Sequence, residues 1–396
     1  MTNLWITICM FLLLFLFIGL FLIYLGISRV QHAHSSCVIM FLLLPTTLLA
    51  WIIGGYGISF FPGIETYYQY LDWLLSSGEA IPLNYSYPNP IIFLSFNYLF
   101  CLIACAIVVG AALERCNYFF ICSFIFLWVL LIYAPVARLT TFENGLLRRE
   151  GLLDFAGGLL VHVNSGFSAL ALSVFVGKRL DFFNLRKKYN NGLMALGFLL
   201  TLVGWLGFNG GSALSFSKDV PLIIINTVIS AFSGIAAWAI IDIFYTPHRL
   251  SITSCGLGLI SGLVGITPGA LYLAPLHSFF VGVITSVAGN YFSRFMIKVL
   301  KIDDTSESFS THGIAGFVGG ILTAVFCLTE FIPGNLTRAQ LIWINLKSAL
   351  IISIYSFLGS LTLIYLTNKK IKARSPKEDE KNGLDIIFHG ERIINP

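Results

Sequence analysis

The chain contains few charged residues: Asp, Glu, Lys and Arg make up 11% of its 396 residues, whereas 57% are hydrophobic and the mean hydropathy is +0.85. Ordinary soluble domains carry about 25% charged residues. No charged stretch exceeds the length of about 40 residues below which a domain rarely folds alone. The composition therefore excludes a hidden soluble catalytic domain. It predicts an all-α integral membrane protein with many spans that is not an enzyme.

Other features are also scarce. The first 27 residues contain neither Lys nor Arg, and no small-residue cleavage site follows their apolar run, so we expect a retained first helix rather than a signal peptide. Of the eight cysteines, only Cys101 and Cys105 share a helix face, and no second pair has metal-ligand spacing. We expect no metal site, no disulfide framework and no cofactor. The net charge of +5 reflects cations in loops and does not indicate nucleic-acid binding.

Long apolar runs dominate what is present. Eleven of them are long enough to span a bilayer: 5–27, 37–58, 92–113, 117–134, 154–176, 191–211, 221–243, 251–267, 270–293, 310–328 and 340–366. An odd number of spans puts the two termini on opposite sides. We therefore expect a membrane domain, residues 1–366, with halves at 5–176 and 191–328, followed by a polar tail, residues 367–396.

The distribution of basic residues sets the expected orientation. Loop 59–91 has three acidic residues and no Lys or Arg, whereas the loop after the fifth segment and the tail are rich in both. The positive-inside rule then places the amino terminus outside and the tail in the cytoplasm. Loop 137–152, with three arginines, is the exception. Ile386, Ile387 and Phe388 interrupt the polar tail, which predicts that this part docks on the cytoplasmic face or on a neighbouring subunit.

Two segments resemble each other at an offset of 150 residues. His162 is followed by Gly166 and Phe167, as His312 is followed by Gly316 and Phe317. Asp154 opens the first of these segments, so a helix from there would carry His162 about 12 Å deeper, well inside a bilayer. The repeat predicts two inverted halves of five helices, each giving one histidine to a common centre.

Less specific interpretations of the same residues remain open. Asp154 has the type and position of a helix N-cap, and Ser212 has the alternative of bonding to its own helix backbone. Phe100 and Phe208 are two of 35 phenylalanines, which by composition alone are core residues. We interpret His277 as structural. The remaining histidines are expected in loops: His32, His34, His248 and His389.

Five groups of residues, in this order, resemble the motifs of the ammonium transporter family (Amt/Mep/Rh), and the bacterial and plant branch more than the Rhesus branch. They are Gly110-Ala-Ala-Leu-Glu-Arg115, Asp154-Phe-Ala-Gly-Gly158 with His162 and Gly177-Lys-Arg179, Gly204-Trp-Leu-Gly-Phe-Asn-Gly-Gly-Ser212, Asp303-Asp304 with His312-Gly313, and Gly383-Leu-Asp385 with His389-Gly-Glu391. The resemblance covers nearly the whole chain.

The resemblance implies a homotrimer in the cell membrane, with one pore per subunit, that takes ammonium (or its analogue methylammonium) into the cytoplasm. It implies a pore lined by His162 and His312 and a gate formed by Phe100 and Phe208. An outer vestibule would be formed by Phe96, Phe142, Ser212 and Asp154. It further implies regulation through Gly383, Asp385, His389 and Gly390 of the tail, and by a cytoplasmic PII-type signal protein.

The vestibule is where the chain departs from the family pattern, which commonly has Trp before the fifth segment. Counting back from Gly145 places Phe142 at that position, whereas counting forward from Pro135 places Thr141 there; we prefer Phe142. Phe is a weaker cation–π partner than Trp. Arg148 and Arg149 nearby would also raise the local potential and oppose cation recruitment.

The chemistry of ammonium suits such residues. Burial of an amine-type cation lowers its pKa by up to about 3–5 units, so a dry pore favours ammonia plus a proton. Two neutral imidazoles that share one hydrogen bond offer ammonia polar contacts without a fixed charge. Three other functions stay open: a haem protein with axial His162 and His312, an ammonium sensor, and a neutral Rhesus-type gas channel. The polar stretch after Thr367 contains no signalling domain, which disfavours the sensor.

Overall fold

The computed structural model describes residues 2–61, 89–180, 190–245 and 250–393, together with the single residues 63, 68, 70 and 182. Within these residues the regular structure is helical, apart from one isolated bridge between Cys116 and Arg374. The first half contains α1 (Thr2–Ile27), η1 (Val30–His32), α2 (Ala33–Ala50), η2 (Trp51–Gly55), α3 (Tyr56–Phe60), α5 (Pro90–Gly110), α6 (Tyr118–Trp128), η3 (Val129–Tyr133), α7 (Ala134–Thr140), α8 (Leu146–Glu150), η4 (Gly158–Val163) and α9 (Asn164–Val176).

The second half and the tail follow: α10 (Asn191–Gly211), α11 (Val220–Tyr245), α12 (Ile252–Ile266), α13 (Pro275–Phe295), η5 (Met296–Leu300), η6 (Phe309–Ile314), α14 (Ala315–Phe326), η7 (Thr329–Phe331), α15 (Arg338–Asn368), α16 (Lys377–Asn382) and α17 (Leu384–His389). Several helices continue directly into one another, as η1 to α3 do in the span Val30–Phe60.

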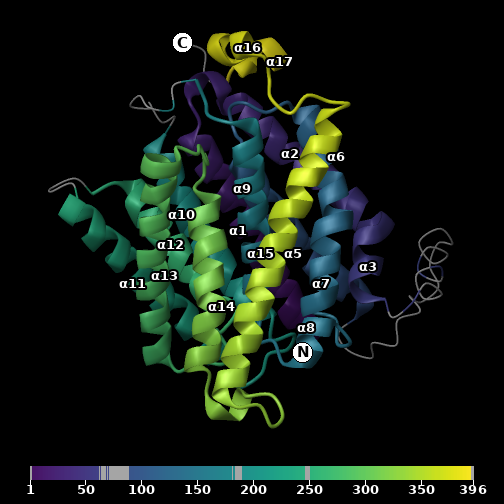
Figure 1. The fold of residues 1–396 in the computed structure, drawn as a ribbon, viewed down its shortest axis with the longest axis vertical. Coiled ribbons are helices and arrows are strands. Elements are labelled where there is room, and N and C mark those ends of the chain that lie inside the picture. The colour runs from purple at the N-terminus through teal and green to yellow at the C-terminus, as the bar shows by residue number, and fades with distance from the viewer. Residues whose placement is uncertain are drawn as a thin grey trace.

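The predicted all-helical membrane architecture is confirmed. Nine helices of the described ranges are long and apolar enough to cross a membrane. The shorter α12 and the more polar α13 complete the eleven segments expected from the sequence. Figure 1 shows the segments as a bundle, with α16 and α17 at one end and α8 at the other. We call these the tail end and the α8 end.

Several boundaries differ from the prediction: the second span begins earlier, at Val30, the fourth ends later, at Thr140, and two further differences have a clear local cause. The fifth segment was expected to be helical from residue 154, but the helix begins at Gly158, because Asp154 caps it and Gly157 adopts a φ of +87° that ends the helical path. The ninth was expected over 270–293, but α13 begins at Pro275 and continues through η5 to Leu300. Proline favours the first helical position, since its missing N–H has no partner there in any helix.

Both histidine segments start with a π-helical turn. η4 contains His162 and leads into α9, and η6 contains His312 and leads into α14. Residues before η4 line a cavity at the α8 end, whereas residues before η6 line a cavity at the tail end. The two segments therefore enter the bundle from opposite ends. Such turns carry an extra residue per turn and are frequent at functional sites.

Candidate functional site: a histidine pair below a phenylalanine stack

A cavity of about 630 Å³ lies at the α8 end of the bundle. Four of the residues predicted for the vestibule or the gate line it: Phe96, Phe100, Asp154 and Ser212. The Ser212 hydroxyl donates to the Phe208 carbonyl, 2.9 Å away, so its oxygen lone pairs are left to accept bonds from a molecule in the cavity. The cavity thus combines aromatic rings with hydrogen-bond acceptors, the groups that attract a small cation.

Between α7 and α8, the residue that lines the cavity is not the one we preferred from the sequence. Phe142 is buried, with 7% of its surface exposed, and does not line the cavity; the Arg138 guanidinium lies over its ring at 4.6 Å. Thr141, the alternative from the forward count, does line the cavity. The Arg148 side chain also lines it and donates to the Thr141 carbonyl at 2.8 Å. Phe142 instead packs against Arg138, and the cavity is lined at this point by Thr141 and Arg148.

The floor of the cavity is a stack of two phenylalanines. The Phe100 and Phe208 rings lie 4.0 Å apart between centroids at an interplanar angle of 22°. Phe96 packs against Phe100 from the side, with centroids 4.9 Å apart. Phe208 is fully buried and Phe100 lines the cavity. Two apolar rings therefore lie between the cavity and the histidine segments.

The two predicted histidines meet directly beneath this stack. The Nδ1 atoms of His162 and His312 are 3.2 Å apart, and the Phe208 ring lies 5.7 Å from the His162 ring. Since a hydrogen bond between two such nitrogens uses one proton, one ring donates and the other accepts. His162 Nε2 is buried and has no hydrogen-bond partner among the described residues. The pair therefore presents unused polar capacity in an otherwise apolar interior.

The glycines of the repeated motif make this contact sterically possible. A Cβ at Gly166 would lie 2.1 Å from the backbone nitrogen of Gly313, next to His312. A Cβ at Gly316 would lie 3.3 Å from the Cβ of His162. Each glycine thus allows its helix to approach the histidine segment of the other half. The spacing His-x-x-x-Gly places the glycine one turn after the histidine, on the same face.

Acidic residues fix the start of both histidine segments. The Asp154 carboxylate accepts hydrogen bonds from the backbone N–H groups of Leu159 and Leu160 at 3.0–3.1 Å. Asp304 accepts from the N–H of Phe309 at 2.7 Å. The offsets are the same, since 159 − 154 and 309 − 304 are both five. Asp304 is therefore the counterpart of Asp154 in the second half, and each carboxylate satisfies free N–H groups at a helix start.

Two contributors to the site were not singled out from the sequence. Trp205 stacks on His162 with centroids 5.0 Å apart at 18°, and its Nε1–H donates to Thr267 at 2.9 Å. The residue lies inside the motif 204–212, but one tryptophan among many aromatic residues gives no sign of a stacking role. Asp304, in contrast, was detectable, because the offset of 150 that pairs the histidines also pairs it with Asp154.

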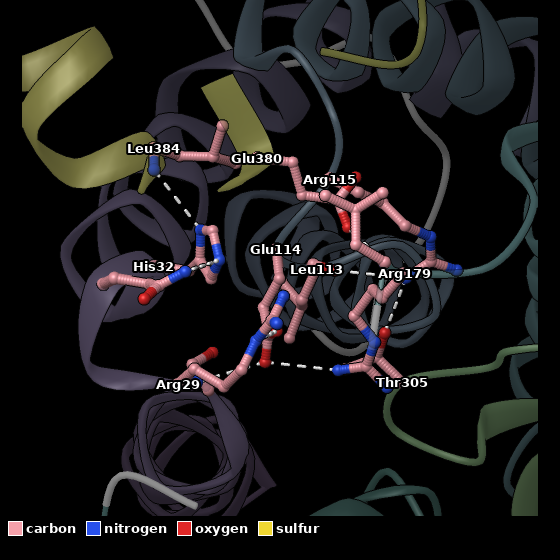
Figure 2. A network of polar contacts seen from close by, with 12 residues as sticks. Arg29, His32, Leu113, Glu114, Arg115, Arg179, Thr305, Glu380 and Leu384 are labelled. Atoms are coloured by element: carbon pink, nitrogen blue, oxygen red, sulfur yellow. Dashed lines mark hydrogen bonds and ion pairs between the residues drawn. The ribbon is translucent and has the colours of Figure 1, made fainter. Parts of the chain in front are cut away.

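At the tail end, buried ion pairs join four connections of the chain, as Figure 2 shows in part. The Glu114 carboxylate contacts Arg29 at 2.6 Å and Arg179 at 3.2 Å, and Arg179 also contacts Asp303 at 2.8 Å. Burial alone raises the pKa of Glu114, but the charges of Arg179 and then Arg29 outweigh it and lower the pKa. Arg115 adds hydrogen bonds to Thr305 and to the Asp303 carbonyl. The loop before η6 is thereby tied to α1, α5 and α9.

His32, expected in a loop, is instead fully buried in η1 at this network. Its Nδ1 accepts a hydrogen bond from the backbone N–H of Leu384 in the tail at 3.3 Å. Its burial arises from the tail, whose docking place the local sequence around residue 32 does not indicate. Figure 2 shows Leu384 directly facing the His32 ring.

The tail docks on its own chain through Leu384, Asp385 and Phe388. Asp385 accepts hydrogen bonds from the N–H groups of His34 and Ser35 at 3.0 and 2.8 Å, at the start of α2, and Leu384 is 1% exposed. Ile386 and Ile387 remain 43% and 45% exposed, so they do not anchor the tail to its own chain, and docking on a neighbouring subunit stays a prediction. Phe388 does pack edge-on against Tyr118, with centroids 5.9 Å apart.

The other predicted tail residues frame this contact. Gly383 and Gly390 have φ of +100° and +68°, and His389 stacks at a tilt on His34 with centroids 5.1 Å apart. A Cβ at Gly383 would lie 3.0 Å from the Gln31 side chain. Positive φ favours glycine, because a Cβ crowds the backbone in that conformation. The two glycines flank the short helix α17, which places Asp385 at the start of α2.

Comparison with known proteins gives a consistent result. The family model described as Ammonium Transporter Family matches residues 4–393. An ammonium transporter of Bacillus subtilis is 32% identical over 383 residues, covering 94% of this chain and 93% of that protein. Ammonium transporter Amt1 of Archaeoglobus fulgidus is 31% identical over 388 residues, covering 94% of each.

Solved structures agree. One described as a Sensor Amt Protein superposes with a TM-score of 0.89 at 26% identity, covering 98% of each chain. The crystal structure of Candida albicans Mep2 superposes with a TM-score of 0.85 at 27% identity, covering 96% of this chain and 87% of that one. The sequence match along almost the whole chain and the shared fold lead to one conclusion: the chain belongs to the Ammonium Transporter Family.

Proposed function

We propose that the protein is an ammonium transporter in which ammonia passes the phenylalanine stack and then moves along the histidine pair. The observation that carries this proposal is the 3.2 Å contact between Nδ1 of His162 and Nδ1 of His312, directly below the stack of Phe100 and Phe208. A neutral, hydrogen-bonding pair in an apolar pore accepts ammonia and offers no fixed charge that would hold a cation.

The proposed sequence of events follows from desolvation. Ammonium collects in the cavity at the α8 end, between the Phe100 ring and the Ser212 oxygen. Passage beyond the rings removes its water, and the free-energy cost of dehydrating a charge is several kcal/mol even after relaxation. The ion therefore gives up its proton to solvent water in the cavity at the α8 end, and neutral ammonia continues along the imidazoles. Whether that proton follows determines if the transport is electrogenic.

The arrangement in the cell is part of the same proposal. We place the α8 end outside and the tail end in the cytoplasm of a cell membrane, because Lys and Arg concentrate in the loop after α9 and in the tail. The family resemblance supports a homotrimer surrounded by lipid and a PII-type signal protein as partner. The docked tail then offers a contact surface for that partner.

Uptake of radiolabelled methylammonium by cells that express the protein, with ammonium as competitor, tests the proposal. We expect saturable uptake that ammonium suppresses. Uptake equal to that of cells carrying the empty vector, with the protein demonstrably in the membrane, would refute the proposed function.

Two alternatives have specific support. A sensor role is favoured by the superposition on the protein described as a Sensor Amt Protein, and it predicts ammonium binding without measurable flux. A neutral gas channel is favoured by the uncharged histidine pair. It predicts flux without current, so ammonium-induced currents in reconstituted bilayers separate it from an electrogenic transporter.

A further inference from the structure

A second, much smaller cavity continues the path beyond the histidine pair. It has a volume of about 30 Å³, roughly the space of one water molecule, and lies at the tail end. His312 lines it, and so do Ser306, Glu307 and Ser308 from the loop before η6. Glu307 is the only acidic residue that lines this cavity in the described part of the chain. A molecule that leaves the histidine pair toward the tail end enters a space bordered by this carboxylate.

The same glutamate also borders a larger pocket at the surface. That pocket has a volume of about 250 Å³ and shares Thr253, Leu257 and Glu307 with the small cavity. It also contains Asp242 and Arg294, whose side chains form an ion pair at 2.6 Å. The Ser293 hydroxyl, from the same pocket, donates a hydrogen bond to Glu307 Oε2. Glu307 therefore stands at the junction between the pore and the tail-end surface.

The backbone at Glu307 is in an unusual conformation. Its φ is +58°, a region that non-glycine residues rarely adopt. The offset of 150 residues that pairs the histidines pairs Glu307 with Gly157, whose φ is +87°. The first half thus uses glycine at this turn, and the second half keeps a carboxylate where glycine would relieve the strain. Strain that persists at one position suggests that the side chain has a use there.

We propose that Glu307 forms a second binding site for small monovalent cations of the ammonium class, at the tail-end mouth of the pore. The carboxylate supplies the negative charge, and the hydroxyls of Ser306 and Ser308 supply further oxygen acceptors on the same cavity wall. The site holds the cation that leaves or enters the pore at this end, as the cavity at the α8 end does at the other. This inference rests on the proposed transport function.

Transport measured separately from each side tests the inference. Sealed vesicles of both orientations are prepared, and their orientation is determined from the binding of a membrane-impermeant antibody to an epitope tag added at the amino terminus. We expect Glu307→Gln to raise the half-saturating methylammonium concentration on the tail side by about tenfold, the effect of losing an interaction of about 1.4 kcal/mol. On the α8 side we expect a change of less than about twofold, within the scatter of independent sites.

Glu307→Gly separates charge from strain. It is expected to raise the melting temperature, because glycine adopts positive φ without a steric penalty, and still to show the same tail-side defect as Glu307→Gln. Lys301→Gly is the matched control. Lys301 has a φ of +55° in the preceding connection and lines neither cavity, so it should gain stability with unchanged half-saturation on both sides.

The outcomes are distinct. Unchanged tail-side half-saturation in both Glu307 variants overturns the inference while the transport function stands. An equal increase on both sides also overturns it, because that result describes a general defect of the pore. Absence of transport in the wild-type protein refutes the proposed function instead.

Discussion

At the scale of single residues, the site depends on two histidines whose surroundings make them partners rather than separate core residues. His162 and His312 are both buried, yet His162 Nε2 has no hydrogen-bond partner among the described residues. A buried polar atom without a partner is costly, at about 1–3 kcal/mol. Such a cost is understandable where a transient ligand completes the bonding, and we take ammonia to be that ligand.

Removal of either imidazole is therefore expected to slow transport strongly. In His162→Ala and His312→Ala we expect methylammonium uptake to fall at least about tenfold, since one lost hydrogen bond in a dry site is worth about 1.5 kcal/mol. His277→Ala is the control, because the His277 ring stacks on Phe326 at 5.1 Å, away from the pore. Unchanged flux and selectivity in both pore variants would remove the pair from the mechanism.

Single residues also show what the sequence was able to predict. The contact between His162 and His312 and the stacking of Phe100 on Phe208 are both present, as motif order and the internal repeat led us to expect, whereas their roles stay predictions. Phe142 was placed on the cavity wall, but it packs under Arg138 and Thr141 takes the wall. A one-residue shift in a loop changes which side chain faces the cavity, and composition does not reveal that shift.

At the scale of elements, the contact between the two histidines depends on how closely two helices approach. The eleven segments follow from hydropathy, since each needs about 20 apolar residues. The π-helical turns η4 and η6 do not, because a periodicity of 3.6 residues contains no sign of one extra residue in a single turn. The close approach of the helices at Gly166 and Gly316 is likewise a property of the tertiary structure that hydropathy does not predict. The repetition of the two glycines in the two halves nevertheless indicated that they matter.

Gly166→Ala tests this approach. The added methyl group would lie 2.1 Å from the Gly313 nitrogen, so the helices have to separate, and we expect a loss of about 1–3 kcal/mol in the free energy of unfolding together with reduced uptake. Melting temperatures in detergent and methylammonium uptake measure the two effects. Gly192→Ala is the control, since its methyl meets only the Asn190 side chain, at 3.1 Å. Normal uptake in Gly166→Ala would show that helix separation leaves the pair intact.

At the scale of the whole molecule, the tail end is held together by charges that come from distant parts of the chain. Glu114 joins Arg29 and Arg179, and its side chain is fully buried. The arginines lower its pKa below the usual value of about 4.5. A group with a lowered folded-state pKa stabilises the fold above its unfolded pKa, and this contribution disappears as the pH falls through the folded value.

Glu114→Gln is expected to lower the free energy of unfolding by about 3 kcal/mol at neutral pH, because Arg29 and Arg179 lose a buried partner. Below about pH 4.5 the difference from the wild-type protein should begin to shrink, because Glu114 is protonated first in the unfolded chain, and it should become smallest once the pH falls below the lowered pKa of the folded state. Melting temperatures of both proteins between pH 3 and about pH 8 check this. A difference that stays constant over this range would contradict the assigned pairing.

The docked tail closes the same end of the molecule, and its attachment depends on one carboxylate. Asp385 accepts from the N–H groups of His34 and Ser35 at the start of α2. Hydrogen bonds to a charged group are worth about 1.5–3 kcal/mol each, so Asp385→Ala should speed hydrogen exchange at these two amides at least about tenfold. It should also make 377–393 accessible to protease. Glu378→Ala, an exposed change in α16, should alter neither. Equal protection of the two amides in both variants would mean that the contacts of Leu384 with His32 and of Phe388 with Tyr118 suffice to hold the tail, and that Asp385 does not anchor it.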